Sequence, residues 1–275
     1  MKIKKIYQLF FSATGTTERI VSSMAGQLGE IIKAPVASID FTPANLRTHT
    51  QEFTEGDLVI VGVPVYAGRV PNVLLPYLQK MLAGNGALAI PVVLYGNRNY
   101  DDALIELRDL LEADGFHTVG AAAFIGEHSF SYDLAKGRPD EQDMKIVERF
   151  SKKMAEQIQT GTENLKYPIP VKGETPLRPY YTPRDRQGNS VNILKVKPLT
   201  KDSCTQCGIC ASVCPMGSIQ AEDCTQITGI CIKCGACVKK CPIGAKYYED
   251  EGYLYHQHEL EAGYTRRAEP ELFLG

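Results

Sequence analysis

Cysteines are the residues of this chain whose spacing most clearly indicates chemistry. None occurs in the first 203 residues, and all nine fall between positions 204 and 241. Eight of them form two runs, "CTQCGICASVCP" and "CIKCGACVKKCP", which share the spacing C-x2-C-x2-C-x3-C-P. A secreted disulfide framework favours an even number of cysteines spread along the chain. The pattern therefore predicts a local inorganic site.

The spacing within each run favours iron–sulfur clusters over structural zinc. Three thiolates two residues apart bind one [4Fe–4S] cube, and the fourth, on a short helix, points away and ligates the neighbouring cube. Zinc usually takes two ligands from each of two separated knuckles, which these runs fit poorly. We assign cluster I to Cys204, Cys207, Cys210 and Cys241, and cluster II to Cys231, Cys234, Cys237 and Cys214. The segment resembles bacterial two-cluster ferredoxins over roughly 50 residues.

The two runs belong to an internal repeat. Each cysteine of the first run recurs 27 positions later, and Gly208, Pro215 and Gly217 recur as Gly235, Pro242 and Gly244. This indicates a duplicated small module, in which each proline turns the chain after the crossing ligand. Cys224 fits neither run, and we interpret it as a small buried residue.

A second candidate site is the hydroxyl-rich stretch "SATGTT" at residues 12–17. It follows an apolar run and precedes a helical pattern, so its hydroxyls and amides lie where a helix N-terminus attracts an anion. It has neither the lysine of a nucleoside triphosphate loop nor the glycines of a dinucleotide fingerprint. The "GNGALA" run at 84–89 precedes a strand instead of following one, so it is dismissed. One hydroxyl suffices for a helix cap, and the surplus favours a single phosphate monoester.

Alternating apolar and amphipathic segments must position this loop. Buried strands are expected at 4–11, 34–40, 57–65, 87–96 and 118–126, and helices at 16–32, 70–82, 101–113 and 140–159. Nearly all-apolar strands separated by helices indicate a parallel sheet covered on both faces. We expect an α/β fold: a flavodoxin-like, doubly wound, five-stranded parallel sheet of order 2-1-3-4-5, followed by a small α+β two-cluster ferredoxin domain.

The motif "SATGTTE" resembles the phosphate loop of flavodoxins, and the likeness extends over about 160 residues. The resemblance implies that this domain binds flavin mononucleotide (FMN). The phosphate would be held by Ser12, Ala13, Thr14, Gly15, Thr16 and Thr17. The ring would lie at the carboxyl ends of the central strands, against Pro64, Val65, Tyr66, Ala67 and Gly68 and against Gly96, Asn97, Arg98 and Tyr100.

Several roles around the ring stay open. Tyr66 or Tyr100 is the candidate for stacking, because the chain has no tryptophan. Arg69 or Arg98 either favours the anionic reduced flavin or is an ordinary surface or salt-bridging arginine. His128, in the loop after the fifth strand, either relays a proton or contacts the linker or the ferredoxin module, and the second interpretation is favoured.

The remaining segments complete the organisation. We expect a flavodoxin-like domain at 1–160, an extended linker at 161–200 that lies across a surface, a ferredoxin domain at 201–250 and a patternless tail at 251–275, with "HQHE" at 256–259 solvated. The net charge of −2 argues against nucleic-acid binding. No apolar run approaches a membrane span, and the basic N-terminus is expected to be a strand and not a signal peptide, which predicts a cytoplasmic protein.

The whole chain resembles flavodoxin–ferredoxin fusion proteins of anaerobic bacteria. The resemblance implies an electron-transfer protein that relays electrons between FMN and two [4Fe–4S] clusters and on to redox partner proteins. The alternative is an FMN-dependent reductase of a small acceptor such as a quinone, fed through the clusters. A redox sensor is a third hypothesis, but it would need a further regulatory domain, and none is evident in the sequence.

Overall fold

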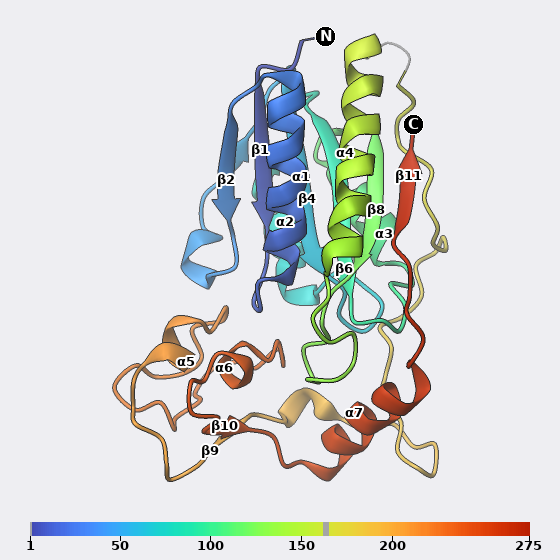
Figure 1. Cartoon of the computed structure of the whole chain (residues 1–275). Coiled ribbons are helices and arrows are strands. Elements are labelled where there is room, and N and C mark those ends of the chain that lie inside the picture. Colours follow the sequence, from blue (N-terminus) through green and yellow to red (C-terminus); the bar gives the residue numbers. More distant parts are fainter. Residues whose placement is uncertain (1, 162–164) are drawn as a thin grey trace.

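The chain forms two lobes that lie end to end in a computed structural model (Figure 1). The structure describes residues 2–161 and 165–275. Met1, the first residue of the predicted first domain, and 162–164, within the predicted linker, lie outside the described residues. The N-terminal lobe is a layered α/β domain, and a cluster module (residues 198–248) lies beyond one end of its sheet.

Five parallel strands form the centre of the N-terminal lobe. They are β1 (Lys5–Phe10), β2 (Val36–Asp40), β4 (Asp57–Pro64), β6 (Leu88–Tyr95) and β8 (Gly120–Ile125). Their order across the sheet is β2-β1-β4-β6-β8, which in terms of these five strands is 2-1-3-4-5 and confirms the predicted fold class. The central strands are apolar along their whole length because helices cover both faces of the sheet.

Helices pack on both faces of this sheet. α1 (Thr16–Ile32) and α4 (Glu141–Thr160) share one apolar core with one face, whereas α2 (Leu75–Lys80) and α3 (Ala103–Ala113) belong to the core on the other face. The segment expected as one helix at 70–82 is shorter, with a 3-10 turn η2 (Asn72–Leu74) before α2. Proline at position 76 suits only the first turn of a helix, which explains the late start. The lobe also contains η1 (Ala44–Leu46) and the two-residue strands β3 (Gln51–Glu52), β5 (Leu82–Ala83) and β7 (His117–Thr118).

The cluster module is built from short elements. These are β9 (Leu199–Thr200), α5 (Ile209–Ser212), α6 (Ala236–Lys239) and β10 (Lys246–Tyr247), preceded by η4 (Ile193–Lys195). Gly208 and Gly235 cap α5 and α6 with φ values of 78° and 71°, a left-handed conformation that glycine adopts without strain. The module lies beneath the carboxyl ends of β1, β4 and β6 (Figure 1).

The C-terminal segment differs from the expected patternless tail. It forms α7 (Glu251–Gly263) and then β11 (Glu271–Leu274), which pairs antiparallel with β8 at the edge of the sheet. His256 is buried against Phe130 and Tyr181, whereas His258 is exposed. The chain therefore leaves the N-terminal lobe through the linker and returns to it through β11 (Figure 1).

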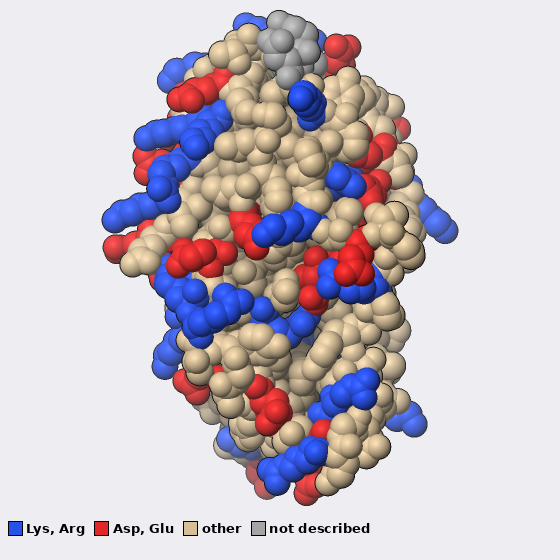
Figure 2. All heavy atoms as spheres, turned by 90° about the vertical axis from the view of Figure 1, so that its right-hand side faces the viewer, with Lys and Arg blue, Asp and Glu red and all other residues tan. Residues whose placement is uncertain are grey.

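The linker follows the surface of the N-terminal lobe before it reaches the cluster module. Ile169 N–H donates to the Thr118 carbonyl at 3.0 Å, and Tyr181 N–H donates to the Ala67 carbonyl at 2.9 Å. On the face that carries β11 and the linker, acidic and basic side chains are interspersed (Figure 2). None of the described helices is both long enough and apolar enough to cross a bilayer.

Candidate functional site

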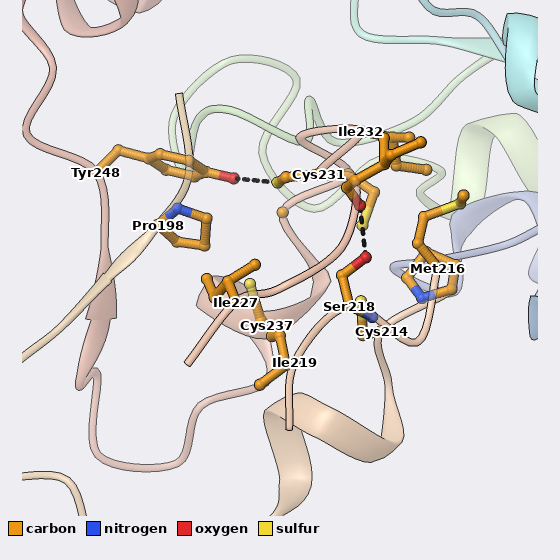
Figure 3. Close-up of a pocket in the computed structure, with 14 residues that line it drawn as sticks. Pro198, Cys214, Met216, Ser218, Ile219, Ile227, Cys231, Ile232, Cys237 and Tyr248 are labelled. Carbon is orange, nitrogen blue, oxygen red and sulfur yellow. Dashed lines mark hydrogen bonds between the residues drawn. The ribbon is translucent and has the colours of Figure 1, made fainter. Parts of the chain in front are cut away.

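The cysteines assigned to cluster II line one apolar hollow. It has about 360 Å³ of empty space, and Cys214, Cys231, Cys234 and Cys237 all face it. Figure 3 shows Cys214, Cys231 and Cys237 around this space, with Ile219 and Ile227 beside Cys237 and the Tyr248 hydroxyl directed at Cys231. That hydroxyl lies 3.9 Å from Cys231 Sγ.

The cysteines assigned to cluster I line a second hollow. Cys204, Cys207, Cys210 and Cys241 surround about 310 Å³ of empty space, together with the ninth cysteine, Cys224, which is buried. The thiols surround these hollows and do not converge on a point. Across the described ranges, no three His, Cys, Asp or Glu side chains lie close enough together to hold a single metal ion.

Polar groups around both hollows suit thiolate-bound clusters. Ser218 N–H donates to Cys214 Sγ at 3.4 Å, and Ala245 N–H donates to Cys241 Sγ at 3.2 Å, at matching places in the two repeats. Burial raises the pKa of Cys234 and of Cys237 to about 12. These thiols therefore hold their protons at neutral pH, and binding a metal cluster must release them.

The hydroxyl-rich loop lies between β1 and α1. Gly15 adopts a φ of 95° at the N-terminal cap of α1, a turn that brings the amides of the loop and the first turn of the helix together. Ser12 Oγ accepts a hydrogen bond from Glu18 N–H at 3.0 Å, and Ser12 N–H donates to Thr42 Oγ1 at 2.7 Å. Ser12 thus fixes the loop to the helix and to the segment after β2, and the sequence analysis did not identify Thr42.

A cavity with about 470 Å³ of empty space, part of it open to solvent, lies next to this loop. Nine predicted FMN contacts line it: Ser12, Ala13, Thr14, Thr16, Thr17, Pro64, Val65, Tyr66 and Gly96. The sequence analysis missed the other walls, which come from the ends of β6 and β8 and from the cluster module: Leu94, Tyr95, Gly126, Glu127, Ser129 and Cys234. A Cβ at Gly126 would lie 3.0 Å from Thr16 Oγ1, so the glycine leaves the loop hydroxyl uncovered. The residues present therefore fit a small phosphorylated cofactor.

Two of the residues predicted for the ring loops, Asn97 and Tyr100, contact the C-terminal segment, and a third, Arg98, contacts its own loop and the linker residue Tyr181. Asn97 Nδ2 donates to the carbonyls of Tyr264 and Arg266 at 2.7 and 2.6 Å. The Tyr100 hydroxyl donates to Glu271 Oε2 at 2.8 Å, and Arg98 pairs with Asp101. Asn97 and Tyr100 fix the returning chain, and none of the three side chains lines the cavity.

The loop after β4 is fixed by an ion pair. Arg69 forms a largely buried ion pair with Glu106 of α3 at 2.6 Å and does not line the cavity, which agrees with the salt-bridging alternative. Ala67 and Gly68 form the tight turn between Tyr66 and Arg69, with φ values of 52° and 78°. Gly15, another predicted FMN contact, lies in a different loop, at the start of α1. A Cβ on Gly68 would lie 2.3 Å from the Asp101 carboxylate, so this turn requires glycine.

His128 lines the cavity and also contacts the cluster module. Its backbone carbonyl accepts a hydrogen bond from Lys239 Nζ at 2.7 Å. Burial, with smaller contributions from Lys239, His256 and Arg98, lowers the pKa of the imidazole to about 3. Nδ1 accepts from Phe130 N–H at 3.1 Å, so the neutral ring presents Nε2–H as its donor.

Lys239 and Arg47 join the two lobes. Lys239 Nζ, on α6, donates to Glu127 Oε1 at 2.6 Å and to the carbonyls of His128 and Ser131 at 2.7 Å each. Arg47 Nη2, just after η1, donates to the carbonyl of Pro215 at 2.8 Å, next to the crossing ligand Cys214. A Cβ on Gly235 would lie 2.4 Å from the Ser129 carbonyl, so the module approaches the N-terminal lobe closely at this glycine.

Cys234 lies at the boundary between two of the hollows. Cys234 lines both the cluster II hollow and the cavity beside the hydroxyl-rich loop. Tyr66, half-buried in the same cavity, lies near enough for Cys234 and Cys231 to add to the effect of burial in raising the pKa of its hydroxyl. The proposed flavin site and cluster II therefore share a wall.

The linker is locked to the loop after β6 by Asp102. This fully buried carboxylate accepts hydrogen bonds from the Arg178 side chain and from the backbone N–H groups of Glu174 and Arg178. The pairing with Arg178 lowers the pKa of Asp102 to about 2. A carboxylate with a lowered pKa contributes its stabilisation fully above its ordinary pKa of about 3.9 and loses it as the pH falls towards 2.

We therefore predict that Asp102→Asn exposes the linker at neutral pH. Removing the charge leaves Arg178 with only the more distant carboxylate of Glu174, at 3.7 Å. We expect trypsin to cleave between Lys172 and Arg186 about tenfold faster, equivalent to about 1.4 kcal/mol. Timed digestion followed by mass spectrometry measures this, with Asp185→Asn, in an exposed linker turn, as the control. Wild-type protection should stay constant between pH 8 and pH 5, and a loss within that range would contradict the assigned role of Asp102.

Two family models match separate parts of the chain. A model described as "Flavodoxin domain" matches residues 8–103, and one described as "4Fe-4S binding domain" matches residues 198–220 and 225–247. No curated protein matches the chain.

Solved structures resemble the N-terminal lobe at low identity. A flavodoxin from the domain Archaea is 14% identical, with a TM-score of 0.42, and the match covers 56% of this chain and 99% of that one. For the Streptococcus pneumoniae TIGR4 flavodoxin the values are 21%, 0.40, 56% and 99%. For the rubredoxin oxygen:oxidoreductase of Desulfovibrio gigas they are 13%, 0.38, 58% and 37%.

Proposed function

We propose that this protein passes electrons directly between FMN and cluster II within one chain. The chain joins a flavodoxin domain to a 4Fe-4S ferredoxin domain and is an electron-transfer protein of the flavin and iron–sulfur type. FMN exchanges one or two electrons when bound, and each [4Fe–4S] cluster exchanges one. The proposal specifies one FMN and two clusters, with the ligand sets assigned above.

The observation that carries this proposal is the position of Cys234. The Cys234 side chain borders both the cluster II hollow and the cavity beside the hydroxyl-rich loop. No further protein layer therefore separates the two sites there. Holding donor and acceptor in one molecule replaces a bimolecular encounter by an intramolecular step at high effective concentration. Lys239, Arg47 and the return of β11 to the sheet hold the lobes in this arrangement.

The residues around the cavity have complementary tasks. The hydroxyls of Thr14 and Thr16 and the amides at the start of α1 bind the phosphate, where the helix N-terminus favours an anion. Tyr66 borders the ring side next to Cys234, and neutral His128 offers a single N–H donor without adding charge. The chain thus fixes the cofactor at both ends of its cavity.

Cluster I is the proposed contact with redox partner proteins. Cys207, one of its ligands, is exposed, whereas two of the cluster II ligands, Cys234 and Cys237, are buried. Electrons would therefore enter or leave the chain at cluster I, and FMN would communicate with the outside through cluster II. Turnover of a quinone-like acceptor by the isolated chain, without any partner protein, would contradict this carrier role.

The phosphate assignment gives a direct test with two ligands. We predict that Thr14→Val with Thr16→Val weakens FMN binding by at least about 100-fold, because each lost hydroxyl removes a hydrogen bond to a charged group worth about 1.5–3 kcal/mol. Riboflavin, which lacks the phosphate, should bind with nearly unchanged affinity. Fluorescence titration of the flavin-depleted protein measures both affinities, with Thr48→Val at an exposed position as control. Equal weakening for both flavins would place the phosphate elsewhere.

A further inference from the structure

Lys246 is a buried cation beside the cluster I hollow. Its side chain lines that hollow together with Cys204, Cys210 and Cys241, and the residue is only 3% exposed. Nζ donates to the Thr200 hydroxyl at 2.6 Å and to the Cys224 carbonyl at 2.5 Å. Both acceptors are neutral, so the protein itself leaves the charge unbalanced.

Buried ammonium groups normally have an anionic partner, since an isolated charge in a low-dielectric site is strongly destabilising. Within residues 2–161 and 165–275, no carboxylate forms an ion pair with Lys246. Four thiolates around an iron–sulfur cube supply such a partner, because the assembly is net negative and becomes more negative on reduction.

The internal repeat provides a built-in comparison. A shift of 27 residues places Ile219 at the position that matches Lys246, and Ile219 lines the cluster II hollow as Lys246 lines the cluster I hollow. The surrounding positions also correspond, since Cys214, Pro215 and Ser218 match Cys241, Pro242 and Ala245. The side chains that line the two hollows thus differ by one charge at an equivalent place. Lys233, the other buried lysine of the module, lines neither hollow and donates to the carbonyls of Leu194 and Cys231.

We propose that Lys246 is the counter-charge of cluster I and makes it the cluster of higher reduction potential. A nearby cation stabilises the extra negative charge of the reduced cluster. This inference rests on the proposed function, and it adds a direction: electrons delivered from the flavin side through cluster II run on to cluster I. The charge of Lys246 also reaches Cys237 of cluster II, so that cluster experiences a smaller effect of the same sign.

The test replaces Lys246 by isoleucine, the residue at the matching position of the first repeat. An anaerobic redox titration followed by EPR should show two cluster potentials in the wild type, of which the higher belongs to cluster I. In Lys246→Ile the reduced-to-oxidised ratio of that cluster at a fixed potential should fall at least about tenfold, which is about 59 mV for a one-electron couple. The lower potential should move less.

Further variants separate charge from structure. Lys246→Arg should keep the wild-type potentials. Lys246→Gln still offers a donor to the Thr200 hydroxyl, and it should lower the higher potential as Lys246→Ile does. If the isoleucine variant loses its clusters, the glutamine variant tests the effect of the charge in its place. Lys240→Ile, an exposed site of the same module, should change neither potential. Unchanged potentials in both Lys246→Ile and Lys246→Gln, with two clusters intact, would overturn the inference, whereas a wild type without two clusters would overturn the proposed function.

Discussion

Cys214→Ser is expected to remove cluster II and leave cluster I, so that iron falls from about eight atoms per chain to about four. The crossing assignment underlies this expectation, because Cys214 lies in the first run but faces the hollow lined by Cys231, Cys234 and Cys237. A hollow with three thiolates and one hydroxyl holds a cube poorly, whereas the four cysteines around the other hollow are untouched.

Double variants show which cysteines act together. Adding Cys231→Ser to Cys214→Ser should cost no further iron, since both residues serve the same cluster. Adding Cys204→Ser instead should remove the remaining iron, because Cys204 serves cluster I. Anaerobic iron and sulfide analysis measures each variant, and Cys224→Ser, which leaves all eight ligands in place, is the control.

Two outcomes would contradict the assignment. If each run bound its own metal, the pair Cys214 and Cys204 would behave as one unit, and Cys231 would act independently. If the anaerobically purified wild type contained zinc and no iron, the module would be a structural zinc domain.

Lys239→Ala is expected to slow electron transfer between the lobes about tenfold or more. Its ammonium is the shared donor for Glu127 and for the carbonyls of His128 and Ser131. Removing it leaves a partly buried carboxylate and two carbonyls without that donor, at a cost of about 2–3 kcal/mol. Because the other contacts between the lobes remain, we expect a looser interface and not full separation.

The rate can be followed by reducing the flavin with a laser flash and recording the arrival of the electron at the clusters. Lys240→Ala is the matched control, since this neighbouring lysine is exposed and should give the wild-type rate. Lys239→Arg should recover part of the rate by restoring the charge. A wild-type rate in Lys239→Ala, with all cofactors bound, would show that this contact does not position the cluster module.

The local parts of the site were predictable from the sequence because they depend on local spacing. The 27-residue repeat indicated both ligand sets, and the two observed hollows contain these sets. The apolar strands indicated a parallel sheet, and its order followed from the likeness to flavodoxins. The loop from Ser12 to Thr17 borders the cavity in which we propose that the phosphate binds.

The contacts between distant segments were not predictable in this way. Asn97, Arg98 and Tyr100 follow a central strand, as ring-binding residues would. Asn97 and Tyr100 are bound instead by a C-terminal segment in which no pattern was found, and Arg98 lies over Tyr181 of the linker. β11 has only four residues, and its pairing with β8 depends on tertiary placement that no local period records. The positions of Lys239 and Cys234 against the N-terminal lobe likewise depend on how the lobes dock.

The central claim is that flavin and cluster II exchange electrons within one chain. Its most direct test is the rate of cluster reduction after flash reduction of the flavin, measured in the wild type over a wide range of protein concentrations. We predict a first-order rate that does not depend on concentration. A rate that rises in proportion to concentration would show that electrons pass between separate molecules, and it would contradict the account.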